Sequence, residues 1–181
     1  MRKFQTALFA VVASAALATA AHAQSADGDT HGYATVGYQH SDLSLYGKGL
    51  TSLNVSAALN VWKFISVEGD LAIDGGSKST TYEGHKAKAE LENNFAGYAV
   101  ATYTVSPNFD VLGRVGFLEA KTKAHGGSFS DEQQASGPAI GVGVHYFPHG
   151  GKNGIALDLT YADFDRDGHD SIGQIAYVRR F

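Results

Sequence analysis

The sequence predicts an all-β protein, an eight-stranded antiparallel up-and-down β-barrel that spans a membrane and is preceded by a cleaved signal peptide. Segments of about ten residues alternate between apolar and polar side chains, and a tilted strand of that length crosses a bilayer core. The connections alternate in kind: they are long and polar near residues 42, 74, 119 and 163, and short near 62, 106 and 148. A membrane barrel has short turns at one end and long loops at the other, whereas a soluble sandwich has no reason to sort its loops in this way.

The N-terminal segment reads as a secretory signal peptide, residues 1–23. Arg2 and Lys3 form its basic start, residues 7–18 form an apolar run, and Ala21-His22-Ala23 is a cleavage site with small residues at its first and third positions. The apolar run is too short for a transmembrane helix. Residues 24–181 then form one domain, the barrel.

The composition narrows the function classes. Without Arg2 and Lys3, 12 basic residues remain against 18 acidic ones, a net charge of about −6 that argues against nucleic-acid binding. Cysteine is absent, so a secreted chain of this size must be held by its core, by closed backbone pairing or by a membrane. The 22 glycines, 9 tyrosines and 10 phenylalanines suit crowded short strands with rings at interfaces.

The hairpin Ser52–Ile73 shows the strand pattern most clearly. Its first arm sets Leu53, Val55 and further apolar residues on one face against serines and asparagines on the other, and its second arm repeats the alternation. The predicted strands are residues 31–41, 52–61, 65–73, 88–105, 109–118, 137–147, 155–162 and 171–181. The fourth of them is the least regular, because Tyr98 and Val100 fall on the face opposite its apolar set.

The other elements follow from composition. Residues 74–85 and 119–136 are polar stretches without an apolar period, which predicts long loops, the second of them mobile. In strand 137–147 glycine occupies alternate positions, which lets bulky neighbours fill a narrow barrel interior. Rings near the short turns predict an aromatic girdle at the membrane interface, made of Trp62, Phe64, Tyr103, Phe109, Tyr146 and Phe147.

The last residues resemble the terminal strand of bacterial outer-membrane barrels. The whole mature chain is similar to the small eight-stranded OmpA-like and OmpX-like outer-membrane β-barrel superfamily, with Phe64–Glu68 and Phe109–Gly116 resembling its third and fifth strands. The resemblance implies a bacterial outer-membrane location and a C-terminal signal, read by the barrel-assembly machinery, that comprises Ile175, Tyr177 and Phe181. Arg179 stands where these barrels usually carry an aromatic residue, and Tyr177 takes its place.

The polar faces of the strands put charged side chains inside the barrel. This interior charge network comprises Glu68, Asp70, Arg114, His145 and Asp158. An eight-stranded barrel is just wide enough to be filled by side chains, so these groups must pair. A charge network around Arg114 is the favoured interpretation, and a conducting channel or proton path is the alternative. Diffusive porin function is not expected, since open pores need about sixteen strands.

The histidines and one short motif bear on two further kinds of site. The mature histidines, such as His31, His40, His85, His125, His149 and His169, are scattered and not at ligand spacing, so neither a metal nor a cofactor is predicted. Some small outer-membrane barrels are lipid A deacylases with a His-x-Ser-Asn motif. His169-Asp170-Ser171 matches only its first part, because Ile172 follows where the motif has Asn, and a polar turn is the favoured reading.

The expected function is therefore non-enzymatic, in envelope integrity or surface adhesion. Exposed rings in the long loops are candidate contacts with a host surface or matrix ligand: Leu45, Tyr46, Tyr82 and Phe129. The expected partners are outer-membrane lipid, lipopolysaccharide and the assembly machinery, with the barrel a monomer. A lipid A-modifying enzyme and a soluble periplasmic barrel of lipocalin type are the alternatives. The second needs an apolar interior, and the predicted inner face is polar.

Overall fold

The computed structural model describes residues 32–43, 49–74, 78–82, 85–126, 129–164 and 168–181. For residues 43, 74, 78–82, 85–92, 122–126 and 129–133 it describes the backbone alone. The strands are β1 (Gly32–Leu43), β2 (Leu50–Trp62), β3 (Ile65–Asp74), β4 (Lys78–Tyr82), β5 (His85–Ser106), β6 (Phe109–Gly126), β7 (Phe129–Tyr146), β8 (Asn153–Phe164) and β9 (Gly168–Arg180), with a 3-10 turn, η1, at Pro148–Gly150. No helix in these ranges is long and apolar enough to cross a membrane.

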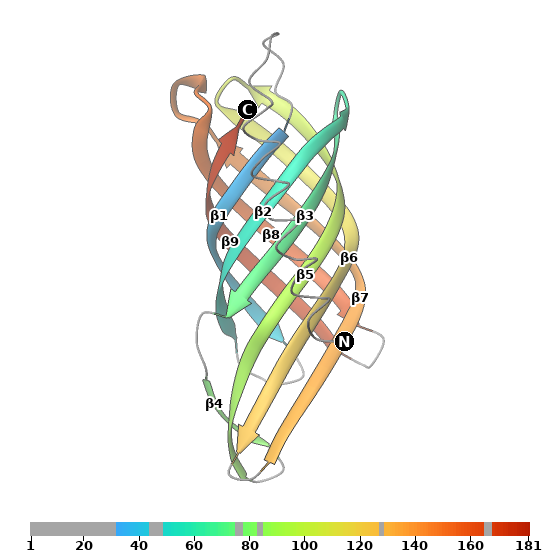
Figure 1. Ribbon diagram of the computed structural model, residues 1–181. Helices are drawn as coiled ribbons and strands as arrows, with labels where there is room; N and C mark the ends of the chain where they lie inside the picture. Colours follow the sequence, from blue (N-terminus) through green and yellow to red (C-terminus); the bar gives the residue numbers. More distant parts are fainter. Residues whose placement is uncertain (1–31, 44–48, 75–77, 83–84, 127–128, 165–167) are drawn as a thin grey trace.

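Eight of these strands close into an antiparallel barrel, as predicted (Figure 1). Strands that are neighbours in sequence pair with one another, except β3 and β4. The ring is completed by β1 with β9, and by β3 with β5 from Ile65 opposite Ala101 to Ile73 opposite Asn93. The last of these pairings skips β4, which adds to β5 outside the ring. Closure gives every barrel strand a partner on both sides, which removes the exposed sheet edges that a bilayer does not tolerate.

The side chains alternate as the sequence predicts, with the apolar face outward. On β2, Val55 is 43% exposed while its neighbour Ser56 is 4% exposed. The outward face carries large apolar residues all around the barrel, and the inward face is polar at mid-height. Tyr98 and Val100 point inward, which explains why strand β5 looked irregular. Only a lipid environment makes an apolar exterior around a polar interior stable, since water would reverse the two faces.

Three strands are longer than the sequence suggested. β5, β6 and β7 run well beyond the part of the ring they share with β3 and β8, and they form the lower projection in Figure 1 with β4. Residues 74–85 and 119–136 were expected to be loops, and this was wrong for most of their length. These segments are mostly polar in sequence, so their strands are set by backbone pairing, for example Lys121 opposite Gln134, and leave no clear periodic signal.

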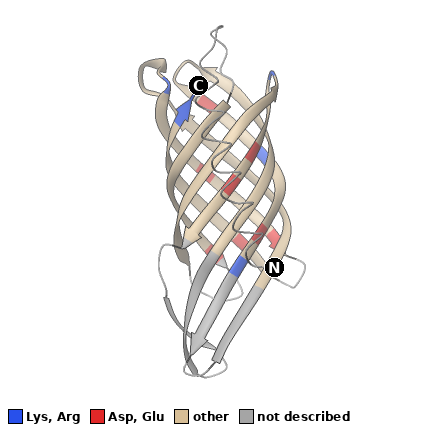
Figure 2. Ribbon diagram, viewed as in Figure 1, with Lys and Arg blue, Asp and Glu red and all other residues tan. Residues whose placement is uncertain are grey.

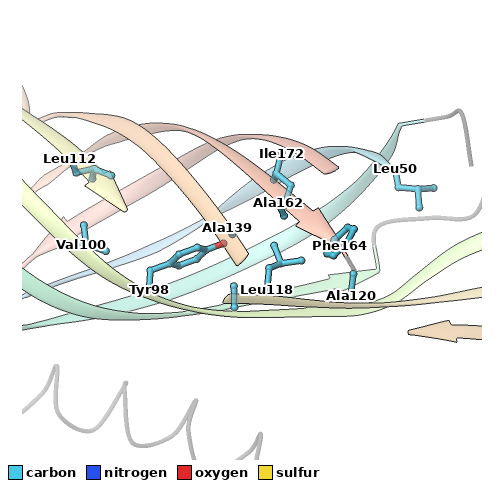
Figure 3. Packing of buried hydrophobic residues seen from close by; sticks show 11 residues of the cluster. Leu50, Tyr98, Val100, Leu112, Leu118, Ala120, Ala139, Ala162, Phe164 and Ile172 are labelled. Atoms are coloured by element: carbon cyan, nitrogen blue, oxygen red, sulfur yellow. The ribbon is translucent and has the colours of Figure 1, made fainter. Parts of the chain in front are cut away.

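The inward apolar residues form two clusters. One cluster lies toward the projecting strands and includes Leu50, Tyr98, Leu118, Phe164 and Ile172 (Figure 3). The other lies toward the short turns and comprises Tyr33, Ala58, Phe147, Ala156, Ala176 and Val178. The first cluster also contains Val100, which is opposite Arg114 in the strand register, so apolar and polar side chains share the middle of the lumen.

Candidate functional site

The middle of the lumen holds the interior charge cluster: Tyr33, Glu68, Arg114, His145 and Asp158, each from a different strand. Arg114 Nη1 lies 3.0 Å from Glu68 Oε1, and Arg114 Nη2 donates to Asp158 Oδ1 at 2.6 Å. All three side chains are at most 3% exposed. One guanidinium therefore ties β6 to β3 and β8 across the lumen, and it compensates two buried carboxylates.

The remaining members complete the polar contacts of this cluster. The Tyr33 hydroxyl donates to a Glu68 carboxylate oxygen. His145 Nε2 lies 4.0 Å from Asp158 Oδ1, and its ring meets the Tyr33 ring edge-on with centroids 5.0 Å apart. The Arg114 guanidinium also lies over the ring of Tyr98, 5.5 Å from its centroid. The acids, the bases and the rings are thus packed against one another.

Two glycines on β7 make room for this packing. A Cβ on Gly143 would lie 2.0 Å from Asp158 Oδ1, and one on Gly141 would lie 2.8 Å from the Leu159 carbonyl oxygen and 2.9 Å from Arg114 Cγ. No side chain fits at either position while the ion pair keeps its place. The alternating glycines of the sequence therefore serve the cluster directly.

Asp70, predicted as part of the network, is bonded elsewhere. Its carboxylate accepts from Asn54, which also donates to Gln39 Oε1 at 3.1 Å and accepts from Gln174 Nε2 at 2.8 Å. We call Gln39, Asn54 and Gln174 the amide ladder. A cavity of about 10 Å³ beside it, lined in part by Asp70 and Tyr98, is large enough for about one water. At this level too, side chains fill the lumen.

The short-turn end is closed by Arg180 and Phe147. The Arg180 guanidinium lies 4.1 Å from the centroid of the Phe147 ring and donates to the carbonyl oxygens of Pro107, Gly150 and Gly151 at 2.8 to 3.1 Å. Phe147 was predicted to join the outer girdle, and this was wrong, because its side chain is 1% exposed and lies inside the barrel. It follows the outward Tyr146, so strand alternation turns it inward.

The other predicted girdle residues point outward near the short turns. Trp62 and Tyr103 are 78% and 68% exposed, and Phe64, Phe109 and Tyr146 also face outward. A second outward set near the opposite end was not recognised as a belt in the sequence: Tyr38, Phe95, Phe117 and Tyr161. Phe109 and Phe117 are eight residues apart on β6, roughly 27 Å along the strand. With the strand tilted, this separation fits the apolar band of a membrane barrel, roughly 25 Å tall.

The residues of the expected assembly signal lie on and after β9. Ile175 and Tyr177 point outward, and the Tyr177 hydroxyl donates to Asn153 Oδ1 at 2.6 Å. The Phe181 amide donates to the Gly32 carbonyl oxygen at 3.1 Å, which joins the end of the chain to the start of β1. The loop candidates Leu45 and Tyr46 lie outside the described residues, and for Tyr82 and Phe129 the backbone alone is described, within β4 and β7.

The enzyme-like motif does not assemble as a unit. His169 and Ser171 face outward, whereas Asp170 faces inward and accepts from the Ser41 hydroxyl. The His169 ring stacks on the Tyr161 ring, with centroids 5.8 Å apart. Among the described residues no three His, Cys, Asp or Glu side chains group as metal ligands do.

Charged residues are sparse along the described strands of the barrel (Figure 2), and the large exposed side chains of its wall are apolar, as expected of a surface in lipid. Residues 9–181 match the family model of the outer membrane protein beta-barrel domain. The chain belongs to this family. It is therefore a bacterial outer-membrane protein, with its short turns on the periplasmic side and β4 and the projecting ends of β5–β7 outside the cell.

Solved structures of small outer-membrane barrels share the fold. Ail, the attachment invasion locus protein of Yersinia pestis, in complex with the heparin analogue sucrose octasulfate, aligns with a TM-score of 0.61 at 16% identity, over 83% of this chain and 99% of Ail. Neisserial surface protein A aligns with a TM-score of 0.60 at 13% identity, over 86% of this chain and 100% of its own. The N-terminal barrel domain of Pseudomonas aeruginosa OprF aligns with a TM-score of 0.59 at 9% identity, over 84% of this chain and 100% of that domain. No curated protein sequence matches this chain.

Proposed function

We propose that this protein is a non-enzymatic, non-conducting scaffold of the outer membrane that displays its outer strands to the surroundings of the cell. The interior charge cluster carries the first part of the proposal. Arg114 bridges Glu68 and Asp158 across the lumen, and the Phe147–Arg180 pair covers the periplasmic end. Moving an ion past these contacts would require breaking a buried ion pair, which costs several kcal/mol, about 3–5.

The projecting strands support a display role in adhesion. Beyond the ring β5 pairs with β4 and with β6, and β6 pairs with β7, as in Lys88 opposite His125 and Gly126 opposite Phe129. A paired sheet presents a surface at lower entropic cost than a free loop. The solved Ail complex holds a heparin analogue, which makes a polyanionic matrix component a reasonable first ligand to test. The barrel acts as a monomer delivered by the assembly machinery.

Single-channel recording tests the sealed lumen. The wild-type protein, refolded and added to a planar bilayer, should give no steady conductance steps. The double variant Asp158→Asn, Arg114→Met lacks the ion pair across the lumen. Its conductance is the comparison for a barrel whose lumen is no longer sealed. Steady steps from the wild type would contradict the non-conducting scaffold.

Shortened variants test display separately from barrel integrity. Residues 75–92 are replaced by an Asn-Gly turn between Asp74 and Asn93, and in a second variant residues 122–133 are replaced between Lys121 and Gln134. Both variants keep every pairing of the ring, so they should assemble and preserve resistance to detergents and bile salts. Adhesion of cells to immobilised heparin and to extracellular matrix should fall. Unchanged adhesion by both variants would remove the adhesive part of the proposal and leave the structural part.

The lipid A-modifying enzyme remains the competing function. It predicts that deleting the gene changes the acyl composition of lipid A and that Ser171→Ala reproduces the change. The scaffold predicts identical lipid A in all three strains.

A further inference from the structure

The lipid-facing wall has a depression centred on Gly173. Two adjoining hollows of about 770 and 660 Å³ share His40, Val142, Leu159 and Gly173. Gly173 lies between His40 on β1 and Leu159 on β8, and a Cβ there would contact only Leu159 Cδ2, at 3.7 Å. The missing side chain therefore leaves room for an alkyl chain. We call Leu159, Gly173 and Ile175 the Gly173 groove.

A carboxylate is held on the extracellular side of this groove. Asp42 lines the second hollow, and its Oδ1 atom lies 3.5 Å from His40 Nε2. The other ring nitrogen of His40 lies 3.2 Å from Thr51 Oγ1, so the imidazole is held from both sides and positions the carboxylate. The Asp42 side chain is 67% exposed, which leaves it open to a further partner.

An aromatic ring lines the same hollow as this carboxylate. Tyr161 and Asp42 are both opposite Ser171 in the strand register, and all three residues line the hollow. The Tyr161 ring stacks on the His169 ring, with centroids 5.8 Å apart, and Tyr161 is still 46% exposed. An ammonium group binds to both kinds of neighbour, to a carboxylate as an ion pair and to an aromatic ring by a cation–π contact.

The charges around the groove disfavour a phosphate or a carboxylate head. The described outward side chains of β1, β8 and β9 on the extracellular side of Gly173 include two acids and neither lysine nor arginine: His40, Asp42, Tyr161, Asp163, His169 and Ser171. An anionic head would meet these acids without the lysine or arginine that usually binds it. A positively charged head without phosphate is the complementary ligand. We call Asp42, Tyr161 and Asp163 the acidic rim.

We propose that the Gly173 groove and the acidic rim form a binding site for one cationic amphiphile, an alkyl chain that ends in an ammonium group and carries no phosphate. The alkyl chain lies over Gly173 between Leu159 and Ile175, and the ammonium group pairs with Asp42 beside the Tyr161 ring. Long-chain amines and cationic surfactants belong to this class. The rim lies toward the extracellular ends of β1 and β9, so the site is open to amphiphiles that arrive from outside the cell. It depends on the outer-membrane location of the family and not on the proposed display role.

Native mass spectrometry of the folded protein in a non-ionic detergent tests the site. Octadecylammonium and octadecanoate are the first two probes, because they have equal chain length and opposite charge. The wild type should bind one octadecylammonium about tenfold more tightly than octadecanoate, the preference expected of one exposed ion pair together with one cation–π contact. Phosphatidylethanolamine, which carries its ammonium group beside a phosphate, is the third probe and should bind as weakly as octadecanoate.

Two substitutions separate the charge from the groove. Asp42→Asn removes the charge while keeping the side-chain shape, so it should abolish the preference for octadecylammonium over octadecanoate. Its matched control is Glu119→Gln on β6, since Glu119 is another outward acid, with its side chain 42% exposed, and this variant should keep the preference. Gly173→Leu fills the groove and should weaken octadecylammonium binding about tenfold. Its control is Gly97→Leu, since Gly97 also faces outward, has nothing within 4 Å of its Cβ position and lies on β5, across the barrel.

The charge variants keep the test decisive if Gly173→Leu fails to fold. Equal binding of octadecylammonium and octadecanoate by the wild type, or an unchanged preference in Asp42→Asn, would overturn the proposal. So would binding of phosphatidylethanolamine as tight as that of octadecylammonium, because the ligand would then be a phospholipid. A wild-type dimer that Gly173→Leu converts to a monomer would also overturn it, because the groove would then hold a second copy of the chain.

Discussion

Replacing Arg114 with methionine removes the cation that two buried carboxylates share. Glu68 and Asp158 are 1% and 3% exposed, so neither can recover its interaction with water without opening the barrel. Removing one partner of a buried ion pair costs about 3–5 kcal/mol. Glu68 keeps the bond from Tyr33, whereas Asp158 loses its 2.6 Å partner. We therefore expect the free energy of unfolding to fall by about 4 kcal/mol, roughly a thousandfold in the equilibrium constant.

Urea unfolding from lipid vesicles measures this loss. Trp62 is the single tryptophan of the chain and lies 78% exposed on the lipid-facing belt, so its fluorescence reports the loss of the membrane environment. The control is the triple variant Arg114→Met, Glu68→Gln, Asp158→Asn, which removes every charge at once and should regain more than half of the stability. A loss below about 1 kcal/mol for Arg114→Met, the range of a surface pair, would refute the buried bridge.

Three other predictions test the wall, the glycines and assembly. Val55→Arg should cost about 2–4 kcal/mol at mid-membrane and Val61→Arg at the interface about 0–1, by the same unfolding assay; equal costs would mean that this face does not lie in lipid. Gly143→Ala places a Cβ 2.0 Å from a carboxylate oxygen of the interior charge cluster and should lower the unfolding midpoint, whereas Gly113→Ala, with nothing within 4 Å, should leave it unchanged. Phe181→Ala should reduce the amount of folded protein in the outer membrane, measured by blotting the membrane fraction, and normal levels would reject its role in the assembly signal.

Much of the barrel could be predicted because alternation records which face each residue meets. Val142 and His145 were assigned to opposite faces from parity alone, and the structure agrees. The same rule places Phe147 inside, because it follows the outward Tyr146, whereas its position beside a short turn favours the outer girdle. The second aromatic belt has no signal of its own in the sequence, because Tyr38 and Phe117 alternate as any apolar strand residue does.

The sequence does not show which inward side chains bond to one another in the lumen. Parity identifies Asp70 and Asp158 equally as inward acids, yet only Asp158 bonds to Arg114, while Asp70 bonds to Asn54. The stagger between neighbouring strands decides which inward residues share a level, and no residue type encodes that stagger. The extensions of β5–β7 could not be predicted for a related reason, since strands whose residues are mostly polar on both faces carry no clear period of two.

Fractionation of the native host, followed by gel electrophoresis with and without boiling, tests most directly whether this chain is a closed barrel in lipid. The account predicts that the protein is found in the outer-membrane fraction and migrates differently before and after heating, because the closed hydrogen-bonded ring resists detergent until heated. A soluble periplasmic species whose mobility does not change on boiling would contradict it.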